Sequence, residues 1–136
     1  EQAKTRLVGV EPEVIAKYNV VSAPVAARMA LGAAAASGSD IAVSVTGVAG
    51  PTGGDEVRPV GTVYLGAARG DTVYVQKLFV SRPDRALVRA RAAQAALALA
   101  LRLAQGKVPA HTKPLAASEQ HSAAALDALN EAFLAE

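Results

Sequence analysis

The chain has 136 residues, the length of one ordinary domain, and 51% of them are hydrophobic. A domain of this length buries about two-thirds of the surface of its unfolded chain, so a real core is expected. The net charge of +2 and the scattered Lys and Arg residues give no nucleic-acid signal, and the lack of cysteine excludes disulfides and thiolate metal sites. No apolar stretch is long enough for a membrane span and the amino end has no apolar leader, so we expect a cytoplasmic protein that contacts no membrane.

Two helices are predicted ahead of the first strand. Residues 10–18, VEPEVIAKY, predict a short helix with Pro12 in its first turn, where the missing N–H is tolerated. Residues 20–40 predict a longer helix that is capped by Ser22 and ended by Gly38. One face of this second helix carries residues at helical spacing: Val25, Met29, Ala33 and Ala36. Because the face is made largely of small side chains, the helix can lie close to a sheet.

Three strands are predicted next. Residues 40–47, DIAVSVTG, alternate around three β-branched side chains and predict a buried strand: Ile41, Val43 and Val45. Residues 59–68, PVGTVYLGAA, and 72–80, TVYVQKLFV, predict two further strands. The RGD sequence at 69–71 predicts a tight turn, which would make the last two strands an antiparallel hairpin.

Residues 81–106 predict a long helix. Ser81 and Asp84 resemble a capping box, Pro83 would lie in the first turn, and Gly106 would close the helix. Four leucines in its second half alternate as in a strand: Leu97, Leu99, Leu101 and Leu103. The strong helix propensity of Ala and Leu and the length of the run favour a helix. Since this half is apolar nearly all round, we expect it to be covered on more than one side, for example at a subunit interface.

The C-terminal residues are predicted to stand apart from a domain at 1–106. Residues 107–118 read as a linker and 119–136 as an amphipathic helix with Leu126, Leu129 and Phe133 on one face. We expect this face to dock on another surface, such as that of a neighbouring chain, and the protein to be at least a dimer. The whole order of elements predicts the α/β class, as a three-layer α/β/α sandwich with a mixed sheet that is incomplete at the N-terminus.

A glycine-rich stretch at 44–66, SVTGVAGPTGGDEVRPVGTVYLG, contains the loop that joins the first two strands. Glycine adopts positive φ and lets backbone N–H groups approach an anion, so such a loop can cradle a phosphate. However, a strand follows the loop where a phosphate-binding loop has a helix, and no GKS or GKT occurs. Judged by its residues alone, the loop is a turn.

The string VTGVAGPTGG followed by RPVGTVYLG resembles the signature of the CinA carboxy-terminal domain family, the competence/damage-inducible proteins that include nicotinamide mononucleotide deamidases. Three more segments agree with the family in order and spacing, so that the resemblance runs from about residue 1 to 106: EQAKTRLVGV, VSAPVAARMA and LFVSRPDRALVRARAAQAAL. It implies a three-layer α/β sandwich with a mixed sheet. The 136 residues contain neither a cysteine nor the family's Glu-Ser-Cys-Thr-Gly-Gly motif, and SRPDR stands where the family usually has Gly-Asp-Arg.

The resemblance implies an amidohydrolase that converts nicotinamide mononucleotide to nicotinate mononucleotide and ammonia, without a cofactor or a metal. In the family's proposed route the motif serine attacks the amide carbonyl and a lysine removes its proton, and Lys4 corresponds to that lysine. Because the motif serine is absent from these residues, we expect the chain alone to deamidate negligibly, with Ser22, Ser44 or Thr46 as replacement nucleophiles if it does not. The alternative is a non-catalytic nucleotide-binding or protein-interaction module on the same scaffold.

The resemblance also implies that the glycine-rich loop binds the substrate. Its implied binding residues follow the first strand: Thr46, Gly47, Gly50, Gly53 and Gly54. Arg85 matches the arginine of the family's Asp-Arg pair, and it is equally compatible with phosphate binding and with an ordinary surface position.

Five other residues are expected to have no role in the chemistry. Arg58, beside the loop, is expected to be a surface arginine. His111 and His121 lie in the linker and tail without metal-ligand spacing or a carboxylate partner, so no metal site is expected. Tyr64 and Tyr74 are expected to pack across the hairpin.

Overall fold

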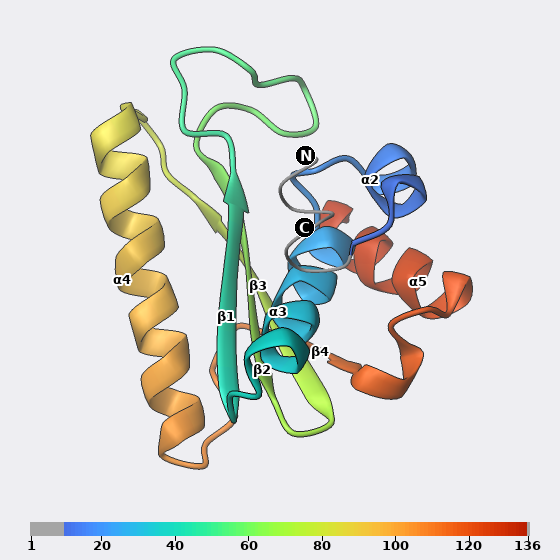
Figure 1. The fold of residues 1–136 in the computed structure, drawn as a ribbon. Helices are drawn as coiled ribbons and strands as arrows, with labels where there is room; N and C mark the ends of the chain where they lie inside the picture. Colours follow the sequence, from blue (N-terminus) through green and yellow to red (C-terminus); the bar gives the residue numbers. More distant parts are fainter. Residues whose placement is uncertain (1–9, 136) are drawn as a thin grey trace.

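The computed structural model describes residues 10–135, which form three layers (Figure 1). In chain order the elements are α2 (Pro12–Tyr18), α3 (Ala23–Ser37), β1 (Ile41–Gly47), β2 (Thr62–Arg69), β3 (Thr72–Phe79), α4 (Arg85–Ala104), β4 (Lys113–Ala116) and α5 (Ala123–Leu134), with a 3-10 turn over Ala117–Glu119. The sheet has the strand order β1-β2-β3-β4, with α4 on one face and α3 and α5 on the other. The α/β class and the three layers are therefore confirmed. Every described pairing is antiparallel, so these residues do not form the mixed sheet that we expected.

The first two helices begin and end as their sequences predict. Pro12 opens α2, and the Ser22 hydroxyl caps α3 by accepting the Val25 N–H at 3.3 Å. Gly38 ends α3 at φ 68°, in the left-handed region that favours glycine.

The α3 helix lies very close to the sheet. A Cβ placed on Gly66 of β2 would lie 2.5 Å from the Ala26 carbonyl oxygen, so only glycine fits there. The face that packs deepest differs from the predicted one and consists of Ala23, Ala26, Ala27, Ala30 and Leu31. Of the predicted face only Val25 is buried, while Ala36 is exposed. Alanine on every side of the helix hides from the sequence which side meets the sheet.

Strand β1 lies at one edge of the sheet that the described residues form, and the expectation of a buried strand is wrong for its apolar face. Ile41 and Val43 are half-buried beside α4, and Val45 is 40% exposed. The buried side chains are instead Ser44 and Thr46, whose hydroxyls donate to backbone carbonyl oxygens at 2.6 and 2.8 Å. Because successive side chains point to opposite faces, these polar residues meet the α3 side.

The hairpin of β2 and β3 is confirmed. Arg69 pairs with Thr72 across a two-residue turn in which Gly70 has φ 61°. Tyr64 packs across the hairpin as expected, with Lys77 Nζ 5.8 Å from its ring centroid, and it also meets the edge of another aromatic ring on the α5 side. Tyr74 joins the cluster on the α4 side.

Helix α4 begins later than its sequence suggests. Asp84 is the N-cap and accepts the Leu87 N–H at 2.9 Å, so Ser81 forms no capping box and Pro83 precedes the helix. Gly106 follows the helix at φ 74°, as predicted.

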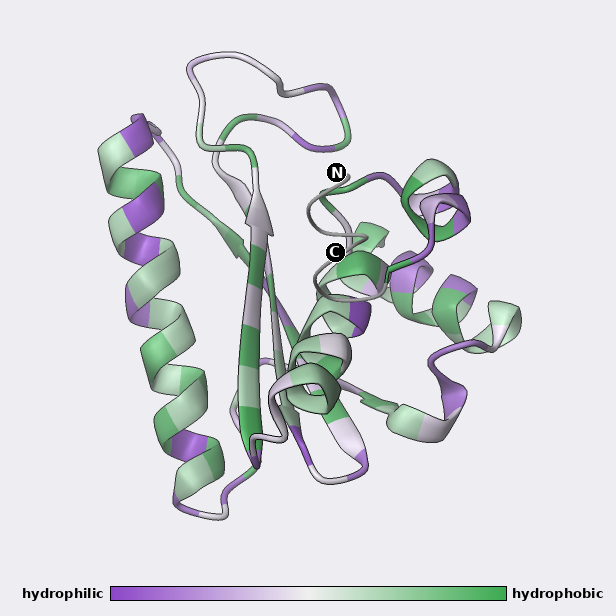
Figure 2. Cartoon of the chain, viewed as in Figure 1, coloured by the Kyte–Doolittle hydropathy of each residue, from purple (hydrophilic) through white to green (hydrophobic). Residues whose placement is uncertain are grey.

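In the part of the chain that the structure describes, the α4 helix is covered on one side only. Four of its residues are buried against the sheet: Val88, Ala92, Leu99 and Leu103. Leu97 is 72% exposed and Leu101 is 59% exposed, so no described residue supplies the second cover that we expected. Figure 2 shows apolar residues on more than one side of this helix. Within residues 10–135 no helix has the length and apolar character that a membrane crossing needs.

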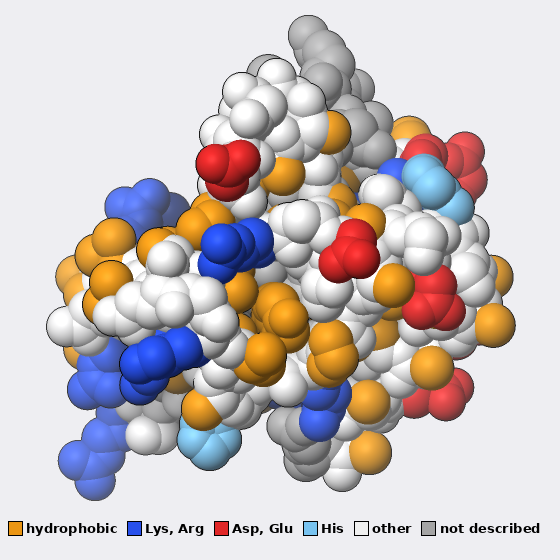
Figure 3. All heavy atoms as spheres, turned by 90° about the horizontal axis from the view of Figure 1, so that it is seen from below, with side chains coloured by type: hydrophobic (Ala, Val, Ile, Leu, Met, Phe, Trp, Pro, Cys, Tyr) orange, Lys and Arg blue, Asp and Glu red, His pale blue; other side chains and the backbone are white. Residues whose placement is uncertain are grey.

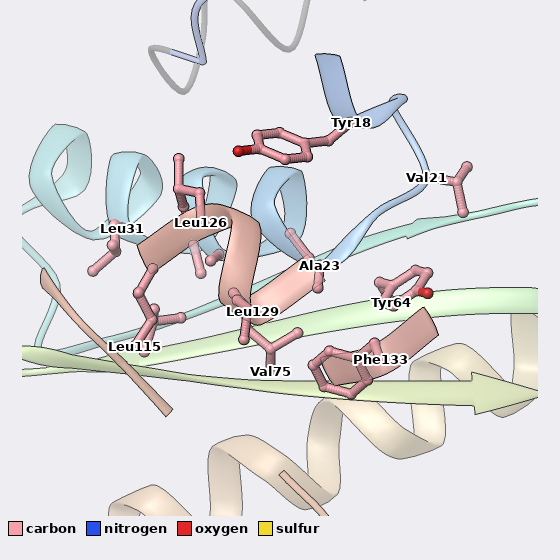
Figure 4. Close-up of a cluster of buried hydrophobic side chains, with 14 of the residues drawn as sticks. Tyr18, Val21, Ala23, Leu31, Tyr64, Val75, Leu115, Leu126, Leu129 and Phe133 are labelled. Carbon is pink, nitrogen blue, oxygen red and sulfur yellow. The ribbon is translucent and has the colours of Figure 1, made fainter. Parts of the chain in front are cut away.

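The C-terminal segment belongs to the sheet and its core. Residues 113–116, predicted as linker, form β4, which pairs with β3 from Thr72–Ala116 to Val75–Lys113. Pro114 is tolerated because this strand is at the edge. The apolar face of α5 is confirmed, but it packs on α3 and the sheet of its own chain (Figure 4), so the expectation of a neighbouring chain as its partner is wrong.

Candidate functional site

The glycine-rich loop between β1 and β2 stands at one end of the sheet (Figure 1). Between this loop, the link that joins α2 to α3, and the start of α4 lies a cavity of about 410 Å³, here called the loop cavity. Among its lining residues are four of the predicted binding residues: Gly47, Gly50, Gly53 and Arg85. Thr46 and Gly54 do not line it. The structure thus brings together residues that are far apart in the sequence.

The loop needs its glycines for its own shape. Gly50 has φ 87° and Gly53 has φ 98°, and a Cβ on Gly50 would lie 2.5 Å from a Val60 methyl carbon. A Cβ on Gly54 would lie 2.6 Å from the Val60 nitrogen, so Gly54 permits close packing within the loop. Loop closure therefore accounts for the glycine pattern, whether or not the backbone N–H groups also meet a ligand.

Thr46 anchors the loop's first strand. Its side chain is 3% exposed, and its hydroxyl donates to the Val20 carbonyl oxygen at 2.8 Å. Ser22 and Ser44 are also buried, and their hydroxyls donate to the carbonyl oxygens of Asn19 and Ala26. Buried hydroxyls that are committed to backbone carbonyl oxygens are not favoured as replacement nucleophiles.

Arg58 has a larger role than the sequence indicates. Its Nε donates to the Val21 carbonyl oxygen at 2.5 Å and its Nη2 to the Tyr18 carbonyl oxygen at 2.8 Å. The Asp55 carboxylate in turn accepts the backbone N–H of Arg58 at 2.6 Å. Arg58 therefore ties the loop to the link between α2 and α3. Nothing in its local sequence signals this, because both acceptors are distant backbone oxygens.

Arg85, the first residue of α4, closes the other side of the loop cavity. Its Nη1 donates to the Gly50 carbonyl oxygen at 3.2 Å. The lining therefore carries two guanidinium groups, from Arg58 and Arg85, and one carboxylate, from Asp55. The excess positive charge suits an anionic ligand, and arginine matches the oxygens of phosphate in particular.

Lys4 lies outside the described residues, and the two histidines lie away from the loop cavity. His111 is exposed in the segment before β4, and His121 Nδ1 is 3.9 Å from a Glu11 carboxylate oxygen, so the expectation that His121 lacks a carboxylate partner is wrong. Across residues 10–135, no three His, Cys, Asp or Glu side chains gather as metal ligands would.

The sequence is similar to that of a known protein family and to those of two curated proteins. The sequence model of the CinA C-terminal domain family matches residues 1–104. A CinA-like protein of Geobacter sp. (strain M21) is 51% identical over 88 residues, which are 65% of this chain and 21% of that protein. The nicotinamide-nucleotide amidohydrolase PncC of Escherichia coli (strain K12) is 43% identical over 98 residues, 71% of this chain and 58% of that protein.

A solved structure agrees with the sequence matches. The competence/damage inducible protein CihA from Agrobacterium tumefaciens aligns with a TM-score of 0.74 at 34% identity, over 77% of this chain and 64% of that one. The fold and its glycine loop thus define an α/β domain of the competence/damage-inducible class. The chain belongs to the CinA C-terminal domain family, and it spans about a fifth to three-fifths of the length of these curated relatives.

Proposed function

We propose that this chain binds a pyridine mononucleotide in the loop cavity and takes part in the hydrolysis of its carboxamide. The observation that carries the proposal is the cavity itself, in which the family's signature loop, Arg58 and Arg85 meet. The E. coli relative named nicotinamide-nucleotide amidohydrolase supports this substrate class. We further propose that the protein acts in the cytoplasm and as a homo-oligomer.

The proposed reaction replaces ammonia by water in two steps. In the first step, the hydroxyl of the serine in the family's motif, which is not among these 136 residues, adds to the amide carbonyl while Lys4 takes the hydroxyl proton. That proton then leaves with the amide nitrogen as ammonia. Water next attacks the resulting ester, which releases the nicotinate nucleotide and regenerates the hydroxyl. In the loop cavity, Arg85 pairs with the substrate phosphate and the loop from Gly47 to Gly54 faces the rest of the nucleotide.

A non-catalytic nucleotide-binding module is the second candidate. The observation that favours it is that the hydroxyls of Ser22, Ser44 and Thr46 are buried and donate to backbone carbonyl oxygens. An ammonia assay distinguishes the two candidates. We expect negligible turnover by these 136 residues, turnover once the family's serine segment is added, and loss of that turnover in Lys4→Ala.

Binding is tested separately with Arg85→Gln. Removing a charged hydrogen-bond donor from the phosphate is expected to weaken nicotinamide mononucleotide binding by about 10- to 100-fold. The control is Arg89→Gln, an exposed arginine on the next turn of α4 that does not line the loop cavity. Calorimetric titration of both variants and the parent chain is the measurement. Equal affinity in all three proteins would exclude the loop cavity as the phosphate site.

A further inference from the structure

The C-terminal helix, which lies outside the residues matched by the family model, is bonded to the helix that leads into the candidate site. The Tyr18 hydroxyl, at the end of α2, donates to an Asp127 carboxylate oxygen on α5. Lys17 Nζ lies 3.1 Å from the same oxygen. Asp127 is far beyond residue 104, where the family match ends. Asp127, which the family match does not include, therefore bonds to two residues of α2.

The charges at this contact keep it intact near neutral pH. The hydrogen bond from Tyr18, followed by that from Lys17, holds the pKa of the Asp127 carboxyl below its usual value. Burial, followed by the bond to Asp127, raises the pKa of the Tyr18 hydroxyl, so it stays protonated as the donor. Figure 4 shows the Tyr18 ring beside the buried cluster to which Leu126 of α5 belongs.

The other end of the same tyrosine holds the loop. The Tyr18 carbonyl oxygen accepts Nη2 of Arg58 at 2.8 Å, one of the two bonds by which Arg58 fastens the loop to the link. Within the link between α2 and α3, the Asn19 side-chain oxygen accepts the Val21 N–H at 3.0 Å. A continuous path therefore runs from Asp127 through Tyr18 to Arg58, which lines the loop cavity.

We propose that Asp127 is a positioning residue for the candidate site. It fixes the side chain and backbone of Tyr18, whose carbonyl oxygen then holds Arg58 and with it the loop over the loop cavity. Its effect on ligand affinity rests on the proposed function, whereas its effect on the loop does not. Asp127 touches no ligand in this proposal and acts only through Tyr18.

The first test measures amide hydrogen exchange of residues 48–61 in the whole chain. We expect Asp127→Asn and Tyr18→Phe each to speed exchange in this loop by about 2- to 30-fold, the range that networks of this kind transmit. The matched control is Glu131→Gln, an exposed acid on the same helix, which should leave loop exchange unchanged. The turn at Gly70–Asp71, at the other end of the sheet, should not respond in any variant.

The second test is a double-mutant cycle. In an Arg58→Gln background the path is already cut, so Asp127→Asn should add nothing to loop exchange. If Asp127 has only a structural role, its substitution should speed exchange in α5 and α2 and either leave loop exchange unchanged or add to the effect of Arg58→Gln. Either an unchanged loop or an additive effect on the loop would overturn the proposal. Because Tyr18→Phe keeps the ring in the core, it answers the question even if Asp127→Asn does not fold.

Calorimetric titration with nicotinamide mononucleotide then separates the two proposals. If both hold, Asp127→Asn weakens binding by a factor similar to its effect on the loop, and Glu131→Gln does not. If the parent chain shows loop coupling but binds no nicotinamide mononucleotide, the substrate proposal fails and the positioning role of Asp127 holds.

Discussion

The two faces of the sheet are covered in different ways, although one sheet separates them. On one face α3 and α5 enclose a large cluster in which the rings of Tyr64 and Phe133 meet edge to face, 5.7 Å between centroids. On the other face, among the described residues, α4 supplies the helical cover and leaves Leu97 and Leu101 exposed.

The two faces also differ in charge. Residues 85–118, which include α4, contain Arg and Lys but neither Asp nor Glu. In Figure 3 most of the visible basic side chains lie on the α4 side and most of the acidic ones on the opposite side, where α2 and α5 carry Glu13, Asp127 and Glu131. The comparison shows that α4 packs on the sheet with one face and exposes apolar side chains on another, whereas α5 is part of the core.

Truncation of Phe133 should have the largest effect, because its ring is fully buried between α5 and the sheet. Phe133→Ala is expected to lower the free energy of unfolding by about 3–5 kcal/mol, through lost burial and the cavity that remains. Leu134→Ala, at the next and largely exposed position, is the control and should change little. Urea unfolding of both variants measures the difference. A loss for Phe133→Ala no greater than that of its neighbour would mean that α5 is not part of the folded core.

Acid should weaken the α3 side selectively. The hydrogen bond from the buried Arg28 lowers the pKa of Glu11, with burial opposing it. Since the folded-state pKa is below the ordinary value of 4.5, the pair's stabilisation is complete above pH 4.5 and is lost as the pH falls through the lowered pKa. We expect the loss to be about 1 kcal/mol or less, because Glu11 is partly exposed.

The pH dependence is measured by urea unfolding from neutral to acidic pH. The parent chain should lose its advantage over Glu11→Gln in that window. Glu13→Gln, an exposed change on the same helix, should instead run parallel to the parent. Parallel curves for all three proteins would show that the Glu11–Arg28 pair contributes no stability.

The smallest effect is expected on the open side of α4. Leu97→Gln should change the free energy of unfolding by no more than about 0.5 kcal/mol in dilute solution, since the side chain is exposed. Leu99→Ala, two residues along and buried against the sheet, should lower the free energy of unfolding by about 2–5 kcal/mol.

Light scattering at micromolar concentration tests the homo-oligomer that we propose. A loss for Leu97→Gln that grows with protein concentration would place α4 at the interface.

Local signals in the sequence located most of the elements. Ser22 caps α3, Gly38 and Gly106 follow helices at positive φ, and the two-residue turn at Gly70–Asp71 fixes the hairpin. These features depend on a few neighbouring residues, so they can be read directly from the chain. The glycine string at 46–54 likewise led to the family, which the family match confirmed.

Contacts between distant residues were decided only by the tertiary structure. The KPLA segment at 113–116 has no strand pattern and becomes β4 because the edge of β3 offers unpaired backbone groups. Arg58 reaches a carbonyl oxygen 40 residues away, and Tyr18 reaches a carboxylate 109 residues away. The sequence by itself determined where most of the helices, strands and turns form, because these follow from short-range periodicity and backbone preference. It could not determine which side of α3 is buried, what covers α5 or what holds the loop, because those depend on which surfaces the folded chain brings together.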